Sequence, residues 1–297
     1  MAVIALCAAQ GSPGVTTTAL GLAFAWPHDV LVVDADPTGS SAVMAGWLRG
    51  RAPQSSGLID LAFTTGPLRE AVDSHTMPLD SAGRVEFLPG PQSPAQALAC
   101  RDLWAPLRAA LADQGTRGRD VIVDAGQLGL PGSPRPLLDG ADLTLLVTRT
   151  HLPAVAGARA WAETVVREQP WRNPGLLLVG PGNPYGARNM SQVLGLPVIA
   201  TVAHDPATAA VYHRGEQPPR YLGWRWPRRR FETSALVRSL RAASTAISTH
   251  LNQAPSRAPI ARTPVTGAPS SRPATTASPG TNQASTSQPG TSQEVTS

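Results

Sequence analysis

One segment of small residues, spanning positions 10 to 18 (QGSPGVTTT), constrains the fold of this chain more than any other. The apolar run 2 to 8 precedes it, and apolar residues at helical spacing follow from Thr17 to Trp26. A strand, a glycine loop and a helix that opens with hydroxyl residues bring backbone N–H groups and the helix N-terminus together around one anion. The segment therefore predicts a phosphate-binding loop.

The expected positive charge is missing from this loop. A phosphate-binding loop of this kind normally has a lysine between its last glycine and its first hydroxyl residue, where the ammonium reaches the β- and γ-phosphates. Val15 occupies that position, and all 25 basic residues of the chain are arginines. Any replacement charge must therefore be an arginine or come from a partner.

Composition divides the 297 residues into one domain and a tail. Residues 1–251 are long enough to bury a substantial core without disulfides, and the two cysteines, Cys7 and Cys100, fit a reducing compartment. Residues 252–297 are dominated by Pro, Ser, Thr, Gln and Ala, which predicts a disordered tail. The opening apolar run has no basic residues before it, and no run is long enough to span a bilayer. We expect a cytoplasmic protein without an integral membrane segment.

Apolar runs alternate with helical patterns along the domain. Strands are predicted at 30–37, 84–88, 120–124, 142–147, 175–179 and 197–201. Helices are predicted at 40–48, 93–112, 153–168, 206–212 and 233–251, and 49–82 is expected to be irregular. The alternation predicts a doubly wound, mostly parallel α/β sheet. Two of these strands end in carboxylates, the first in Asp34 and Asp36 and the third in Asp124, at the strand ends where such sheets bind ligands.

The order of glycine loop, strand ending in Asp-x-Asp-Pro and strand ending in Asp resembles the ParA/MinD family of P-loop ATPases with a deviant Walker A motif. The resemblance covers about residues 1 to 250 and implies binding of ATP and Mg²⁺. It makes Asp124 the Walker B aspartate, which holds Mg²⁺ together with the Thr16 hydroxyl, and places Asp36 near the attacking water as the catalytic carboxylate. Asp34 has the alternative role of capping backbone N–H groups at the strand end. The implied phosphate loop consists of Gly11, Ser12, Pro13, Gly14, Val15, Thr16 and Thr17.

Three positions depart from the pattern of that family. Gln10 replaces the signature lysine that reaches across a dimer, and Val15 replaces the loop lysine. Val179-Gly180 stands where the family commonly has an asparagine that reads adenine. Because phosphoryl transfer depends on positioning and on positive charge, a site without both lysines should be a poor ATPase.

The basic charge of the chain is concentrated in one stretch. The formal net charge of the whole chain is +5, and six arginines against Glu216 give residues 214–230 a net charge of +5 by themselves. Within this stretch arginines and aromatic residues are interleaved, a composition that can hold phosphates and stack on bases. The arginines concerned are Arg225, Arg228, Arg229 and Arg230. We leave three interpretations open: non-specific nucleic acid binding, a protein or anionic membrane surface, and an ordinary solvated loop.

Two kinds of function follow from the sequence. The first is a MinD/ParA-like nucleotide switch that positions, partitions or assembles a cargo, which could be DNA or a pilus, secretion or conjugation apparatus. Such a protein would have a protein partner and could form a homodimer. The second is a pseudo-ATPase that serves as a binding scaffold, and a variant of it is a basic nucleic-acid-binding module on a degenerate P-loop fold.

Overall fold

The computed structural model describes residues 1–10, 13–50, 57–114, 118–182, 184–216 and 231–253. Its centre is an eight-stranded sheet with the strand order β3-β4-β2-β5-β1-β6-β7-β8. Neighbouring strands run parallel, apart from the antiparallel pair of β3 and β4 at one edge. The strands are β1 (Val3–Ala8), β2 (Asp29–Asp34), β3 (Met77–Pro78), β4 (Val85–Leu88), β5 (Arg119–Gln127), β6 (Leu143–Arg149), β7 (Pro174–Val179) and β8 (Val198–Val202).

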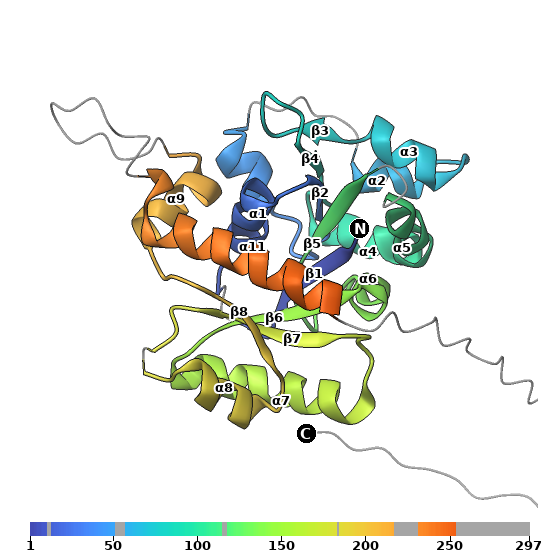
Figure 1. Cartoon of the computed structure of the whole chain (residues 1–297). Helices are drawn as coiled ribbons and strands as arrows, with labels where there is room; N and C mark the ends of the chain where they lie inside the picture. Colours follow the sequence, from blue (N-terminus) through green and yellow to red (C-terminus); the bar gives the residue numbers. More distant parts are fainter. Residues whose placement is uncertain (11–12, 51–56, 115–117, 183, 217–230, 254–297) are drawn as a thin grey trace, which may run out of the picture. The chain divides into compact units, whose positions relative to one another are not determined.

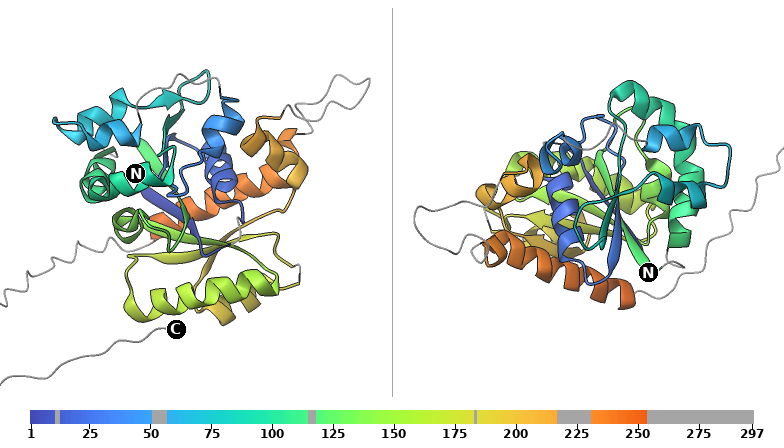
Figure 2. Two further views of the ribbon diagram at one scale, coloured as in Figure 1. Left: turned by 180° about the vertical axis from the view of Figure 1, so that it is seen from behind. Right: turned by 90° about the horizontal axis from the view of Figure 1, so that it is seen from above.

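Helices cover both faces of this sheet, as Figures 1 and 2 show. One face packs on α1 (Val15–Ala25), the π-helical turn η1 (Val43–Trp47), α9 (Pro206–Arg214) and α11 (Ala235–Gln253). The other face packs on α2 (Leu58–Ala62), α3 (Leu68–Ser74), α4 (Pro94–Ala99), the 3₁₀ turn η2 (Cys100–Leu103), α5 (Trp104–Ala112), α6 (Arg135–Gly140), α7 (Leu152–Glu168) and α8 (Ala187–Leu194). The predicted doubly wound, mostly parallel α/β sheet is therefore confirmed.

Alternation along the strands decides which core each side chain enters. In β1, Ile4, Leu6 and Ala8 belong to the core under α1, whereas Ala5 and Cys7 belong to the opposite core. The central strands are buried on both faces because helices cover both, which explains why they read as continuous apolar runs in the sequence. We refer below to the face that carries α1 as the α1 face.

The predicted helix at 93–112 is two helices. Ser93 caps the first, since its Oγ accepts a hydrogen bond from the Gln96 N–H at 3.2 Å. The turn η2 then separates α4 from α5. Pro106 accounts for the interruption, because its ring would clash with the carbonyl of the residue four positions before it in a continuous α-helix.

Other boundaries also differ from the expectation. The stretch 49–82 was expected to be irregular and instead contains α2, α3 and β3, while the predicted helix at 40–48 contains the short η1. The short helices α6 and α8 were not predicted. Strand β5 does not end at Asp124 but continues to Gln127 after a register shift against β1. Short helices carry too few apolar repeats to be recognised by periodicity alone.

Helix α11 overlaps the helix predicted at 233–251 and packs on the sheet. Leu236, Val237, Leu240 and Ile247 are buried, and Leu251 is partly buried against the same core. Residues 254–297, which include most of the predicted tail, lie outside the described residues. Within the part of the chain that the structure describes, no helix has the length and apolarity needed to cross a membrane.

Candidate functional site

The loop between β1 and α1 turns into the helix at Gly14. This residue adopts φ 101° and ψ 40°, a left-handed conformation that glycine accepts without strain. Its carbonyl accepts the first helical hydrogen bond, from the Thr18 N–H at 2.8 Å. The helix therefore begins at Val15, two residues before the predicted start, and Thr16 and Thr17 lie half-buried in its first turn. Gly11 and Ser12 lie outside the described residues, and Pro13 is buried.

Val15 occupies an apolar environment. Its side chain is 7% exposed and joins the core of the α1 face together with Leu6 and Leu20. The position where related loops have lysine is therefore a packing position in this chain. The first turn of α1 keeps its backbone N–H groups, which have no acidic side chain beside them in that turn, but it has no cation.

Gln10 is held by its own chain. Its Nε2 donates a hydrogen bond to the Pro153 carbonyl at 3.0 Å, in the first turn of α7. It also fills the space left by Gly157, where an added Cβ would lie 2.1 Å from the Gln10 Nε2. At the position of the family's signature lysine, this side chain is therefore directed toward α7.

The two carboxylates Asp34 and Asp124 lie side by side. They are direct register partners in the parallel pair β2 and β5, and both lie on the α1 face because Val32 and Ile122, two residues earlier, do. Their side chains are 4% and 2% exposed. Asp124 Oδ1 accepts a hydrogen bond from the Gly126 N–H at 3.0 Å, and Asp34 Oδ1 accepts a long one from the Asp36 N–H at 3.4 Å. Oδ2 of each is buried without a hydrogen-bond partner.

Burial dominates the electrostatics of this pair. Burial, followed by the charge of Asp34, raises the pKa of Asp124, while the Thr16 hydroxyl offsets part of the rise. Burial also raises the pKa of Asp34, against a hydrogen bond from Ser41 that lowers it. A bound cation would relieve both effects, because it favours the charged form of each carboxylate.

Asp36 lies just beyond the end of β2 and turns toward β5. Its Oδ1 accepts a hydrogen bond from the Thr38 N–H at 2.9 Å. Gly126 of β5 has φ 58°, and a Cβ there would lie 2.3 Å from the Asp36 Cγ. Glycine is therefore required at this point so that Asp36 can approach β5. Thr16, Asp36 and Asp124 are thus brought to one edge of the sheet together with Asp34.

The remaining predicted residues divide into two groups. Arg225, Arg228, Arg229 and Arg230 lie outside the described residues, so the prediction of a nucleic acid or partner surface stays a prediction. Strand β7 ends at Val179, and Gly180 follows with φ 67°.

Among the residues described, no group of three or more His, Cys, Asp or Glu side chains is arranged to hold a metal ion. A Mg²⁺ site here would thus depend on Thr16 and one carboxylate rather than on an acidic cage.

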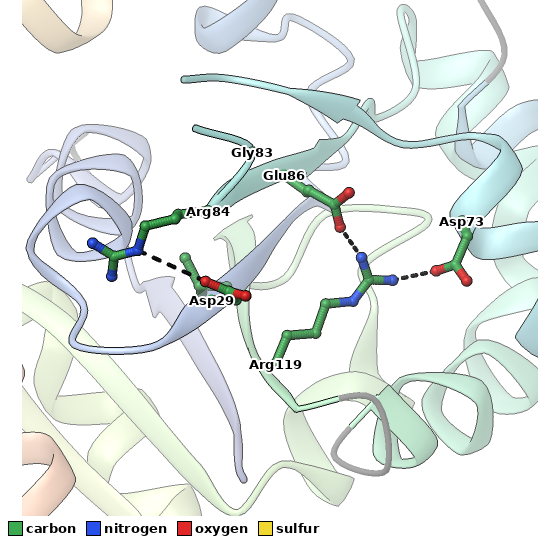
Figure 3. Close-up of a pocket in the computed structure, with 7 residues that line it drawn as sticks. Asp29, Asp73, Gly83, Arg84, Glu86 and Arg119 are labelled. Carbon is green, nitrogen blue, oxygen red and sulfur yellow. Dashed lines mark hydrogen bonds and ion pairs between the residues drawn. The ribbon is translucent and has the colours of Figure 1, made fainter. Parts of the chain in front are cut away.

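A polar cavity of about 330 Å³ lies at the opposite edge of the sheet, where β2, β4 and β5 begin. Figure 3 shows Arg119 between Glu86 and Asp73, with both of which it forms ion pairs, and Arg84 beside Asp29, with Nε and Oδ1 3.7 Å apart. Burial lowers the pKa of Arg119. Both arginines of this cavity are paired with its carboxylates, and the cavity lies at the opposite ends of the strands from the loop, so we do not assign the function to it.

Sequence reasoning overlooked three residues at the loop edge. Gly90 and Gly126 make room for Asp34 and Asp36, and a lone glycine after an apolar strand is too weak a signal to identify them. Arg149 is the last residue of β6, the strand next to β1. Its signal, a charged residue at the carboxyl end of a buried run, is the same one that identified Asp36 and Asp124.

No protein-family model matches this sequence. The uncharacterized protein Rv3660c of Mycobacterium tuberculosis is 29% identical over 217 residues, which cover 72% of this chain and 58% of the relative. The matched segment thus spans less than two thirds of that protein. A sequence from a second strain of the same organism gives the same values.

Solved structures show the fold directly. The cell division ATPase MinD of Pyrococcus furiosus superposes with a TM-score of 0.64 at 17% identity and covers 84% of this chain and 99% of its own. A ParA family ATPase from Chlorobium tepidum gives 0.63 at 15% identity, with 82% and 98% covered. MinD of Pyrococcus horikoshii, solved with Mg-ADP, gives 0.62 at 16% identity, with 84% and 96% covered. The sheet order, the loop between β1 and α1 and these superpositions together establish that the chain has the ParA/MinD-like P-loop fold.

Proposed function

We propose that this protein binds a nucleoside triphosphate with Mg²⁺ between β1 and α1, hydrolyses it weakly or not at all, and uses the bound state to position, partition or assemble a partner. One observation carries the proposal: Asp124 is buried beside Thr16 with one carboxylate oxygen unpartnered. An unpaired buried carboxylate destabilises a fold, so the burial of Asp124 beside Thr16 is best explained by a cation that binds between them.

The residues present fit a phosphate group and its metal only in part. Backbone N–H groups at the start of α1 would hold the phosphates, and Thr16 and Asp124 would hold Mg²⁺. When bound, Mg²⁺ neutralises phosphate charge and polarises the phosphoryl group. Asp36 lies at the same edge, where it can orient a water molecule. A unit charge about 4 Å from a phosphate oxygen contributes roughly 4 kcal/mol at an effective dielectric of 20. Because position 15 holds valine and not lysine, we expect slow hydrolysis of the nucleotide.

The relatives of known structure indicate the kind of process. The superposed proteins include cell division ATPases and a ParA family ATPase, and MinD has been solved in complex with its partner protein MinC from Aquifex aeolicus. We propose a comparable role for this chain, with a protein partner and with DNA or an assembly apparatus as cargo. The arginine-rich stretch 225–230 is the candidate contact with nucleic acid.

A pseudo-ATPase scaffold is the second candidate. Two observations favour it: Val15 is part of the apolar core, and Gln10 is bound to α7 of its own chain rather than free to reach a second subunit. Such a protein would bind its partner through the same fold without responding to nucleotide.

Binding of a fluorescent ATP analogue with Mg²⁺ separates the two candidates. We expect wild type to bind, Thr16→Ala to lose the Mg²⁺ dependence, and Val15→Lys to bind about 10-fold more tightly or better, since one factor of ten corresponds to about 1.4 kcal/mol. Val166→Lys is the matched control, because it adds the same charge at an exposed valine of α7. A wild-type protein that does not bind, beside a Val15→Lys variant that does, would refute nucleotide binding and leave the scaffold.

A further inference from the structure

Arg149 is the last residue of β6, which pairs with β1, the strand that leads into the phosphate loop. Strand β1 has β5 on one side and β6 on the other. Cys7 of β1 pairs with Leu146 of β6, so Arg149 lies level with position 10, where the chain leaves the sheet for the loop. Adjacent strands are about 4.8 Å apart. The guanidinium of an arginine at this position is within side-chain reach of the loop.

Alternation places Arg149 on the same face as the loop helix. Leu143, Leu145 and Val147 of β6 belong to the core of the α1 face, and Arg149 is the next residue in that series. Its register partner in β7, Val179, belongs to the same core. Side chains at matched positions of parallel strands lie on one face. Arg149 therefore extends toward the side where α1 begins.

Within the part of the chain that the structure describes, Arg149 has no carboxylate partner. The side chain is partly buried, and its Nε is buried without a hydrogen-bond partner. Across the described ranges, no ion pair or side-chain hydrogen bond involves its guanidinium, in contrast to Arg119, which has two carboxylate partners. A partly buried guanidinium without an acidic neighbour has donors available for an anion.

The sheet thus places negative and positive side chains on opposite sides of β1, the strand that leads into the loop. Asp34 and Asp124 lie on β2 and β5, on one side of β1, and Arg149 lies on β6, on the other side. All three are on the α1 face at the carboxyl ends of the strands. A cation site and an anion site flank the loop, which is the arrangement that a metal-bound phosphate requires.

We propose that Arg149 supplies the positive charge that Val15 does not, by donating hydrogen bonds to a phosphate group of the ligand held at the loop. This inference rests on the proposed nucleotide binding and adds to it the residue that recognises the anion. In place of a lysine from within the loop, the chain would use an arginine from the neighbouring strand, with a planar fork of donors suited to phosphate oxygens.

Titration of the fluorescent ATP analogue with Mg²⁺ tests this role. We expect Arg149→Gln to weaken binding by about 10-fold or more, as for the loss of a charge-assisted hydrogen bond, and Arg149→Lys to weaken it less, because lysine keeps the charge without the planar fork. Adding Val15→Lys to Arg149→Gln should restore affinity. Arg159→Gln is the matched control, since Arg159 is an exposed arginine of α7 paired with Glu163, and should change nothing.

A measurement on the unaltered protein covers the case in which Arg149→Gln does not fold. Phenylglyoxal labels accessible arginines, and mass spectrometry reads each site. Mg-ATP should protect Arg149 and leave Arg159 labelled. Equal affinity in Arg149→Gln, or no protection of Arg149 by ligand at saturation, would overturn the role of Arg149 while nucleotide binding stands. Absence of binding by wild type would overturn both.

Discussion

Asp34 and Asp124 face each other across neighbouring strands and oppose the fold electrostatically. Both are buried, each has an oxygen without a partner, and no arginine is paired with either in the part of the chain that the structure describes. A buried carboxylate without a compensating partner lowers the stability of the folded state. Val15 shows the opposite substitution, because this apolar residue of the core occupies the loop position where a charged lysine is usual. At this edge the chain keeps the groups that attract a metal ion and lacks the lysine that attracts phosphate.

Asp124→Asn should therefore stabilise the metal-free protein in a pH-dependent manner. The raised pKa means that the native state binds a proton more tightly than the unfolded state, so native stability is lost as pH rises through the folded-state pKa. Each unit of pKa shift corresponds to about 1.4 kcal/mol. We expect the variant to be more stable than wild type by roughly 1 kcal/mol or more near pH 8, with a much smaller difference near pH 5.

Urea unfolding at the two pH values, without Mg²⁺, measures this difference. Asp102→Asn, at an exposed carboxylate in η2, is the control and should show no pH-dependent gain. A stability difference between Asp124→Asn and wild type that stays constant with pH would show that Asp124 does not titrate as an isolated buried acid.

At the scale of elements, the approach of β2 to β5 is set by glycines. The end of β2 passes over Gly126 of β5, and Asp36 occupies the space that a side chain at Gly126 would need. On the other side, Gly90 lies against the Asp34 backbone, where an added Cβ would be 2.3 Å from the Asp34 carbonyl oxygen. The strand ends carry the acidic residues, and the glycines determine how closely those residues converge.

Gly126→Ala should cost more stability than its backbone angle alone explains. Gly83 provides the matched control, because it has φ 66° against 58° at Gly126 but has no atom within 4 Å of an added Cβ. A left-handed alanine costs about 1 kcal/mol. We expect Gly83→Ala to lose about that amount and Gly126→Ala to lose about 1 to 3 kcal/mol more, as in overpacking. Urea unfolding gives the values, and equal losses in both variants would mean that Asp36 moves aside without cost.

At the scale of the whole molecule, α11 completes the core of the α1 face. It contacts β8 and α1, and Leu240 packs so closely on Gly21 of α1 that a Cβ there would lie 2.6 Å from its Cδ1. Burying an aliphatic side chain contributes about 1.5 to 3 kcal/mol. The four large ones of α11 therefore contribute roughly 6 to 12 kcal/mol, which is comparable to the entire stability of a domain.

Truncation tests the division into domain and tail. A chain that ends at residue 253 should unfold within about 2 °C of the full-length protein, because the sequence of the remaining 44 residues offers little apolar surface to bury. A chain that ends at residue 234 lacks α11 and should show no cooperative thermal transition. A large loss of thermal stability in the 253-residue chain would mean that the domain extends past α11.

The sequence by itself determined the loop, the order of the longer helices and of the strands other than β3, and the acidic strand ends, because each depends on neighbouring residues and on periodicity. Only the tertiary structure decided that Asp34 pairs with Asp124, that Gln10 lies on α7, and that Arg149 ends the strand next to β1. These contacts join residues up to 143 positions apart, as between Gln10 and Pro153, and depend on the order in which parallel strands lie side by side. Local pattern gives the end of each strand, and only the packing of the sheet shows which ends are neighbours.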